Sequence, residues 1–310
     1  MTEHDALRDQ RKSSGLTQSE LSRLSGVSVR TIRHIESGHV ARPRHESVRR
    51  LFAVLGPPAT RALSVDVLGP LVVRRGGVLP ISSPQQRALA GLLALQPNRI
   101  VSHAETVDVL WGHTPPATHR ELLYAIVSRL RRHLGDTAIE TTGSGYRLNV
   151  EPDRVDLCRF AEQSARAQEG GDPQAFTEAL GLWRGPVLAD LPEALRRHPR
   201  ALSLQQQRIE TAVAFADRAF PGRAAAVLPW LAELAEIEPW HEELHARLIL
   251  LLADTGRQAD SIFAYQRIRD RLDRDLGLLP GPALKRAHES VLRQEVPRAD
   301  DADRYGTGRW

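Results

Sequence analysis

The sequence predicts a mainly α-helical protein of several domains, with small β-sheets confined to its middle. Three observations predict this fold class. The chain has 310 residues, enough for two or three domains that each bury a core. Apolar residues recur at helical spacing over most of its length, notably in residues 18–37, 119–134 and 155–294. Strand-like runs broken by glycine and proline occupy residues 63–81, and a short hairpin pattern occupies residues 139–150.

The composition is that of an ordinary soluble protein, with 41% hydrophobic and 26% charged residues. No apolar run approaches the roughly 18–20 residues that a membrane span needs. The polar N-terminal segment does not have the features of a signal peptide. Cys158 is the single cysteine, which excludes an internal disulfide and a multi-cysteine zinc site. These features predict a cytoplasmic protein that does not associate with membranes.

Basic charge gathers in the first half of the chain. Residues 1–56 and residues 57–149 each carry ten Lys and Arg against six Asp and Glu, whereas residues 150–310 carry 22 against 26. A basic excess is expected of a region that meets a polyanion, although four charges per segment are also ordinary for a protein surface. The motifs, rather than the charge, must therefore decide what this half binds.

Breaks in the pattern divide the chain into five segments. The run Gly56-Pro57-Pro58 ends the first helical segment. Helices are then expected from about Pro84 to Leu134, before the hairpin. The last residues are polar and without periodicity, so they are expected to be disordered. The predicted segments are a helical domain at 1–56, a linker at 57–64, a mixed domain at 65–150, a helical domain at 153–295 and a tail at 296–310.

Residues 18–37 meet the requirements of a helix-turn-helix motif. Such a motif needs a small residue where its helices cross, a permissive residue in the turn, and apolar positions that fix the second helix. Ser22 is the small residue and Gly26 lies in the turn. The apolar positions are Leu21, Val27, Ile32 and Ile35. Helix caps are predicted at Thr17 with Glu20, as a capping box, and at Ser28.

This segment resembles the phage-repressor family of Cro/C1 (XRE) type across residues 4–56, through motifs such as Gly15-Leu16-Thr17-Gln18 and Ile35-Glu36-Ser37-Gly38. The resemblance implies a five-helix DNA-binding domain in which Gln18 grips a phosphate and Arg44 lies near the minor groove. It assigns base contacts to Ser28, Val29, Arg30, Thr31 and His34, early in the second helix of the motif. Within this set, an arginine can bind guanine in bidentate fashion and a valine can meet a thymine methyl. A helix-turn-helix kept only for protein contact is the alternative.

Residues 119–134 predict a long amphipathic helix. Its apolar stripe consists of Leu123, Ile126, Val127, Leu130 and Leu134. Its opposite face carries Tyr124, Ser128, Arg129 and Arg132, with Arg131 at the margin. A helix in the major groove requires such an arginine-bearing face, but a solvated amphipathic helix shows the same pattern. Upstream, Ser102 with Glu105 predicts a capping box for a helix that Gly112 ends.

The hairpin that follows favours the DNA-binding interpretation. Gly143-Ser144-Gly145 predicts a tight turn, and Tyr146 can pack back as its anchor. With this hairpin, residues 65–150 resemble the winged helix-turn-helix of response-regulator output domains, in the version of the SARP (antibiotic-regulatory) activators. The matching motifs include VLWG at 109–112, VSRLRRHLG at 127–135 and GYRL at 145–148. Two departures bear on the DNA sequence that it reads: Tyr124-Ala125-Ile126 replaces a more polar run, and Thr142 replaces a basic wing residue.

Residues 155–294 resemble the bacterial transcriptional activation domain that follows the winged helix in SARP proteins. The resemblance rests on Val155-Asp156-Leu157, on ALGLWRGPVLADL at 179–191 and on DLGLLPGPALKRAHESVL at 275–292. Glycines at helix turns, small residues within helices and prolines at unit ends fit stacked helix pairs like those of tetratricopeptide repeats. Such stacks form concave surfaces for protein partners. A plain helical dimerisation bundle is the alternative.

One motif suggests an enzyme. The run from His241 to His245, HEELH, matches the H-E-x-x-H pattern of zinc metalloproteases, but no convincing third ligand follows it. Pro239-Trp240 instead places it in the first turn of a repeat helix. No G-x-x-x-x-G-K-[ST] motif or nucleophile elbow occurs. His113 and His119 flank a loop and are expected to be surface or phosphate-contact residues rather than metal ligands. The sequence therefore predicts no enzyme, no cofactor and no bound metal.

Together these motifs predict a DNA-binding transcription regulator. The resemblance implies a SARP-type activator of a secondary-metabolite gene cluster, which binds direct repeats in double-stranded promoter DNA and engages RNA polymerase. A homo-oligomer on the DNA, within the nucleoid, is expected. One alternative is a repressor or autoregulator whose helical domain senses a ligand or a protein partner. The other is a scaffold that does not bind DNA.

Overall fold

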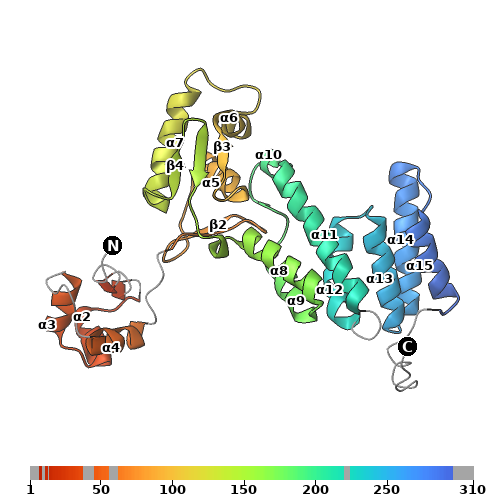
Figure 1. Ribbon diagram of the computed structural model, residues 1–310, viewed down its shortest axis with the longest axis horizontal. Coiled ribbons are helices and arrows are strands. Elements are labelled where there is room, and N and C mark those ends of the chain that lie inside the picture. The colour runs from red at the N-terminus through yellow and green to blue at the C-terminus, as the bar shows by residue number, and fades with distance from the viewer. Residues whose placement is uncertain are drawn as a thin grey trace. The chain divides into compact units, whose positions relative to one another are not determined.

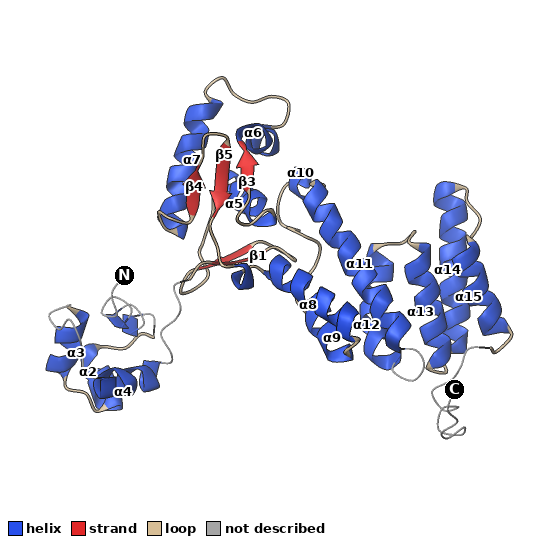
Figure 2. Ribbon diagram, viewed as in Figure 1, coloured by secondary structure: helices blue, strands red, loops and turns tan. Residues whose placement is uncertain are grey.

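The computed structural model describes residues 7–8, 11–12, 14–37, 45–55, 62–219 and 224–295. The chain divides into two units, one of residues 1–62 with 74–78 and one of residues 63–73 with 79–310. Each unit has its own core, and the predicted mainly helical fold with small sheets is confirmed (Figures 1 and 2). Within the described ranges, no helix is both long and apolar enough to cross a membrane.

The first unit contains the helices α2 (Gln18–Ser25), α3 (Val29–Glu36) and α4 (His45–Leu55). Helices α2 and α3 form the predicted helix-turn-helix, and the turn residue Gly26 has a φ of 67°. All four apolar positions predicted from the motif are buried, as are three further residues of the core. This core consists of Leu7, Leu21, Val27, Ile32, Ile35, Leu51 and Leu55.

The predicted caps of both helices are confirmed. The Thr17 hydroxyl accepts a hydrogen bond from the Glu20 N–H at 3.2 Å, and the Glu20 carboxylate accepts one from the Thr17 N–H at 2.7 Å. The Ser28 hydroxyl accepts from the Thr31 N–H at 3.1 Å. Because these bonds satisfy N–H groups that a helix leaves unpaired at its start, they fix where α2 and α3 begin.

The second unit opens with two small sheets and three helices. Its elements are β1 (Ser64–Asp66), β2 (Val72–Arg74), α5 (Pro84–Leu95), β3 (Ile100–Ser102), α6 (His103–Trp111), α7 (His119–Leu134), β4 (Ile139–Thr141) and β5 (Gly145–Leu148). Strands β1 and β2 pair, and β5 lies between β3 and β4 in an antiparallel sheet. The predicted hairpin is therefore confirmed as β4–β5. The expectation of helix alone from Pro84 to Leu134 was wrong, because β3 interrupts it to pair with β5.

The capping box predicted at Ser102 is half present. The Ser102 hydroxyl accepts from the Glu105 N–H at 3.1 Å. The Glu105 carboxylate accepts instead from the Gln96 amide at 2.6 Å and contacts His198 Nε2 at 3.0 Å. Gln96 and His198 therefore take the place of the Ser102 N–H as partners of the Glu105 carboxylate.

Helices fill the rest of the second unit. They are η1 (Pro152–Arg154), α8 (Asp156–Gly170), α9 (Pro173–Leu180), α10 (Glu193–Arg196), α11 (Pro199–Ala219), α12 (Ala224–Ile237), α13 (Glu242–Asp254), α14 (Gln258–Leu276) and α15 (Pro282–Leu292). From α11 onward, consecutive helices pack side by side, as Figure 2 shows. The predicted stack of helix pairs, like that of tetratricopeptide repeats, is confirmed. Its buried leucines and alanines form a core of their own.

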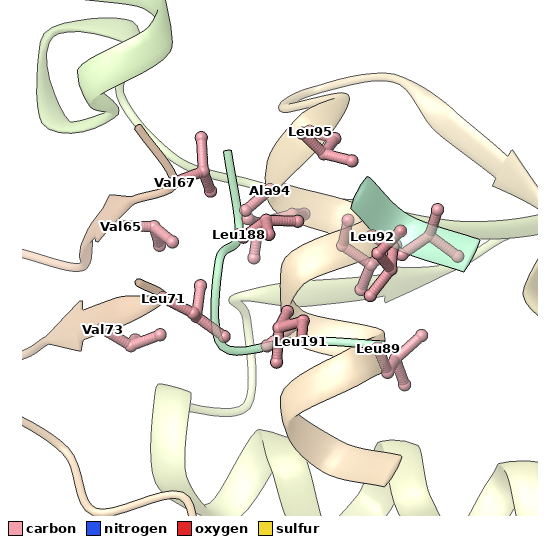
Figure 3. Packing of buried hydrophobic residues seen from close by; sticks show 14 of the residues in the cluster. Val65, Val67, Leu71, Val73, Leu89, Leu92, Ala94, Leu95, Leu188 and Leu191 are labelled. Carbon is pink, nitrogen blue, oxygen red and sulfur yellow. The ribbon is translucent and has the colours of Figure 1, made fainter. Parts of the chain in front are cut away.

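A single apolar core joins the sheets, α5 and α7 to the start of the helical region. Leu188 and Leu191, from the segment between α9 and α10, insert between the first sheet and α5 (Figure 3). Gly91 makes room for them, since a Cβ at that position would lie 2.5 Å from Leu191 Cδ1. Buried residues as far along the chain as Leu204 belong to this core. The winged-helix elements and the first helices of the C-terminal region are therefore packed as one body.

Buried polar contacts reinforce that junction. The Asp156 carboxylate accepts from the Val67 N–H at 2.8 Å and from the Leu68 N–H at 2.9 Å, and it lies 3.5 Å from the Arg184 guanidinium. Burial raises the pKa of Asp156 above its usual value, although the two N–H donors oppose this. The backbone N–H of Arg184 also donates a hydrogen bond to the Leu68 carbonyl at 2.7 Å.

Candidate DNA-binding surfaces

The exposed face of α3 carries most of the base-contact residues predicted for the first unit. Arg30 and His34 are exposed, Val29 and Thr31 are half-buried, and Ile32 faces the core. The predicted base contact Ser28 is also exposed, and its hydroxyl lies 2.8 Å from that of Thr31. The helix thus presents a guanidinium, an imidazole and two hydroxyls. Arg44, predicted near the minor groove, lies outside the described residues.

A buried polar network holds α3 against α2. The Glu36 carboxylate accepts from Arg11 Nε at 2.7 Å and from the Gln18 amide at 2.8 Å. Burial alone would raise the pKa of Glu36, but the bonds from Arg11 and Gln18 and the Arg11 charge offset this and lower it. Since the Gln18 amide has a second N–H, it can still donate to a phosphate from this fixed position.

Helix α7 has the two faces that the sequence predicted. All five residues of its apolar stripe are buried. Tyr124, Ser128, Arg129 and Arg132 are exposed, with Tyr124 60% accessible. Arginine and tyrosine on one face of a 16-residue helix can reach both base edges and phosphates in a major groove.

Arg131 lies at the margin of this face and faces the sheet. Its Nε donates to the Ile139 carbonyl at 2.9 Å, and its Nη2 donates to the Thr141 hydroxyl at 2.7 Å. Both acceptors belong to β4, so Arg131 ties α7 to the hairpin. The sequence pattern placed it next to Arg129 and Arg132, because helical spacing shows which way a side chain leaves the helix but not which neighbouring strand it can reach.

The hairpin is anchored as a wing beside α7 and α6. Tyr146 is fully buried and meets the His103 ring edge-on at 5.2 Å. The His103 N–H donates to the Ser144 carbonyl at 3.1 Å. Gly145 is required at its position, because a Cβ there would lie 1.9 Å from the Val101 carbonyl oxygen. The Thr142 hydroxyl accepts from the Gly145 N–H at 3.1 Å, which closes the turn.

A hollow of about 580 Å³ opens between α6 and α7. The hollow is lined by His119 and the exposed Arg120 from the first turn of α7, and by Tyr124 further along the same helix. Arg120 was not among the predicted site residues, because the motif at 127–135 contains only the arginines at the other end of α7. Its position at the start of the helix was the available signal.

The HEELH run is part of the helix architecture. His241 caps α13, with its Nδ1 accepting from the Leu244 N–H at 3.3 Å. His245 is buried, and its Nε2 lies 3.3 Å from the Glu238 carbonyl. Burial chiefly lowers the pKa of His245 to about 4. Both rings are thus engaged with backbone at the start of a repeat helix, as the sequence predicted for this position.

Three family descriptions match the chain. Residues 7–59 match "Helix-turn-helix", residues 81–148 match "Transcriptional regulatory protein, C terminal", and residues 155–292 match "Bacterial transcriptional activator domain". The matched ranges contain α2 and α3, then the winged helix, then α8 to α15. The predicted resemblances to these three groups are confirmed.

Several curated proteins are similar over most of the chain. Transcriptional regulatory protein MoaR1 of Mycobacterium tuberculosis is 32% identical over 86% of this chain and 89% of its own length. Transcriptional regulatory protein EmbR of the same species is 36% identical over 76% of this chain, which spans 64% of EmbR. Regulatory protein DnrI of Streptomyces peucetius is 31% identical over 75% of this chain and 93% of its own length.

A solved structure shares the architecture. The structure of Mycobacterium tuberculosis EmbR in complex with a low-affinity phosphopeptide has a TM-score of 0.66 and 33% sequence identity, covering 77% of this chain and 67% of that chain. The winged helix followed by a helical stack is therefore a shared arrangement.

Proposed function

Since the chain belongs to the SARP family of bacterial DNA-binding transcriptional regulators, we propose that it activates transcription of a secondary-metabolite gene cluster. In this proposal it binds direct repeats in promoter DNA and engages RNA polymerase. The observation that carries the DNA-binding part is α7, whose exposed Arg129 and Arg132 lie on a helix fixed by its apolar stripe and by the anchored wing.

We assign α7 to the major groove. Arg129 and Arg132 supply long cationic donors for guanine edges or phosphates, while Tyr124 and Ser128 supply hydroxyls. Arg131 stabilises the position of α7 through its two hydrogen bonds to β4. An arginine contact of this kind contributes about 1–3 kcal/mol to binding.

We assign α3 to a second DNA segment. Arg30 and Val29 are placed toward base edges, with Ser28, Thr31 and His34 beside them. Gln18 holds a phosphate at the start of α2, and Arg44 approaches the minor groove. Two DNA-reading helices on one chain raise avidity, because binding of one converts the second contact into an intramolecular one.

We propose that the protein acts within the nucleoid as a homo-oligomer, with one copy on each repeat. The division into residues 1–56, 65–150 and 153–295, joined by a linker at 57–64 and followed by a tail at 296–310, is part of the proposal. No catalytic role is assigned, since the similar proteins are named as regulators of transcription.

One observation favours a second function, that of a repressor or autoregulator which senses a ligand or partner. A hollow of about 660 Å³ lies between α12, α13 and α14, and Leu248, Leu252 and Phe263 are among the residues that line it. A mainly apolar hollow of this size can hold a small molecule or part of a peptide.

Run-off transcription separates the two functions. Genomic binding sites of the full-length protein would first identify its promoter. Purified RNA polymerase holoenzyme would then transcribe that promoter with and without the protein. A rise in transcript that Arg129→Ala abolishes is expected of the activator. A fall in transcript would favour the repressor, and no shift of promoter DNA would exclude both.

A further inference from the structure

The hollow between α6 and α7 is large enough to hold a small molecule. Its volume of about 580 Å³ lies within the range of pockets that bind drug-sized ligands, about 300–1,000 Å³. Ala104 and Val107 line it on the side of α6, and Leu123 and Tyr124 line it on the side of α7. Because these side chains are apolar or aromatic, they favour a ligand with a flat apolar body.

One polar group of this lining lacks a partner. Tyr146 lines the hollow from β5 and is fully buried. Its hydroxyl makes no hydrogen bond to any residue that the structure describes. Burial chiefly raises the pKa of Tyr146, and the neighbouring Tyr124 adds to this, whereas the Arg131 charge opposes it. The hydroxyl therefore stays protonated at neutral pH, and an acceptor on a ligand would satisfy it.

Other polar groups of the lining can accept a hydrogen bond. His119 Nδ1 lies 3.0 Å from the Pro116 carbonyl oxygen. Since a carbonyl only accepts, Nδ1 carries the proton, and Nε2 of the neutral ring is an acceptor. The Asp108 carboxylate is a second acceptor in the lining. A ligand hydroxyl can donate to either group, while the exposed Arg120 can donate to a further ligand oxygen.

A phosphate of the DNA backbone matches only part of this lining. It can accept from Arg120, but a phosphodiester carries no donor for Asp108 or for His119 Nε2. The Asp108 carboxylate would also repel its negative charge. The set of donors and acceptors therefore requires an uncharged molecule that both accepts and donates hydrogen bonds.

We propose that this hollow binds a small planar aromatic molecule that carries a carbonyl and a hydroxyl group, and that the bound molecule competes with promoter DNA. The carbonyl accepts from Tyr146, and the hydroxyl donates to Asp108 or His119. The ring system lies against Leu123 and Tyr124. Because Tyr124 also belongs to the exposed face of α7, the ligand and the DNA require the same side chain. The competition rests on the proposed assignment of α7 to the major groove, whereas ligand binding itself does not.

The test uses 7-hydroxycoumarin as the probe, because it is flat and fluorescent and carries its carbonyl and hydroxyl at opposite ends. Its fluorescence anisotropy would be titrated with the full-length protein in the absence of DNA. Ala104→Phe fills this hollow from α6. Ala232→Phe is the matched control, since it fills the hollow between α12, α13 and α14 and both alanines are exposed. Thermal melting would confirm that both variants fold.

The wild type and Ala232→Phe should bind the probe equally, and Ala104→Phe should lose saturable binding. Tyr146→Phe, which keeps the ring beside His103, should weaken probe binding about two- to tenfold, the effect of one hydrogen bond. Coumarin, which lacks the hydroxyl, should bind the wild type more weakly by a similar factor.

Anisotropy of labelled promoter DNA tests the competition. Saturating probe should weaken promoter binding by the wild type, and promoter DNA should weaken probe binding by the same factor. Promoter binding by Ala104→Phe should not respond to the probe, which controls for any effect of the probe on the DNA itself.

Three results would overturn the proposal. The first is a wild type that shows no saturable probe binding at millimolar concentration. The second is a loss of probe binding in Ala232→Phe but not in Ala104→Phe, which would identify the hollow between α12, α13 and α14 as the site. The third is a promoter affinity that saturating probe leaves unchanged. A wild type that binds no promoter would remove the proposed function but would leave the probe titration intact, so the two failures are distinguishable.

Discussion

Helices α3 and α7 present similar exposed faces but are held in place by different forces. The eight-residue α3 is joined to α2 through the buried Glu36 carboxylate, which binds Arg11 and Gln18. The 16-residue α7 is held by five buried apolar residues and by Arg131, which bonds to β4. The position of α3 thus depends on a charged network in addition to the apolar core of the first unit, whereas that of α7 depends on packing that continues into the C-terminal region.

The largest effect is expected from breaking the charged network. Glu36→Ala leaves the Arg11 guanidinium in a buried site without its counter-charge, which costs about 3–5 kcal/mol. The first unit should then exchange its amide hydrogens rapidly over residues 18–37, as measured by hydrogen–deuterium exchange. The second unit provides the internal control, because all five Trp lie beyond residue 62 and their fluorescence should be unchanged. Protection of residues 18–37 equal to wild type would refute the role of the network.

A similar loss is expected in the second unit from a residue outside the winged helix. Leu188→Ala removes a fully buried side chain from the shared core, at a cost of about 2–5 kcal/mol. Urea unfolding followed by Trp fluorescence should show this loss. Leu202→Ala, at an exposed site, should stay within about 0.5 kcal/mol of wild type. If Leu188→Ala unfolds like the wild type, α7 does not depend on the C-terminal region.

A smaller effect separates the three arginines of α7. Arg129→Ala and Arg132→Ala should each weaken promoter binding by about 1–3 kcal/mol without changing the melting temperature. Arg131→Ala should lower the melting temperature as well, because it removes two hydrogen bonds to β4. The exposed Arg286 on α15 serves as the control, and its replacement by Ala should change neither quantity. Equal melting temperatures for all four variants would contradict the proposal that Arg131 stabilises the contact between α7 and β4.

The smallest effect concerns pH, and it has opposite signs in the two units. The pKa of Glu36 is lowered on folding, so its contribution to stability is present above the unfolded pKa and is lost as pH falls through the folded pKa. The pKa of Asp156 is raised, chiefly by burial, so its contribution grows as pH falls through the folded pKa. Mild acid should therefore loosen residues 18–37 first in hydrogen–deuterium exchange. Glu36→Gln should remove that pH dependence, and a second unit that loosens first would contradict this assignment.

Local chemistry made much of both helices predictable from sequence. The caps at Thr17 and Ser28 and the stripe of α7 depend on residues close together in the chain, and all are confirmed. Tyr146 is buried as predicted, although its ring contact is with the distant His103. The missed features join distant residues. Glu105 meets His198, which lies 93 positions away, and Asp156 meets Val67, which lies 89 positions away.

The same reason explains the remaining corrections. Strand β3 exists because β5 lies beside it, and a three-residue run cannot show that by periodicity alone. The hydrogen bonds of Arg131 to β4 were not predicted either, because helical spacing does not show which neighbouring strand lies within reach; its contact with DNA stays a prediction. The sequence also could not show that Leu188 and Leu191 complete the core between the first sheet and α5, because they lie in a segment without helical or strand periodicity.

The central claim is that α3 and α7 of one chain read neighbouring DNA segments. It is tested most directly by the salt dependence and footprint of promoter binding, for the full-length protein and for residues 57–310. Each phosphate contact adds about 0.9 to the magnitude of the slope of log K against log[salt]. The full-length protein should give the steeper slope and a footprint extended on one side, and Arg30→Ala in the full-length chain should shorten that side. Equal slopes and equal footprints for the two proteins would contradict the claim.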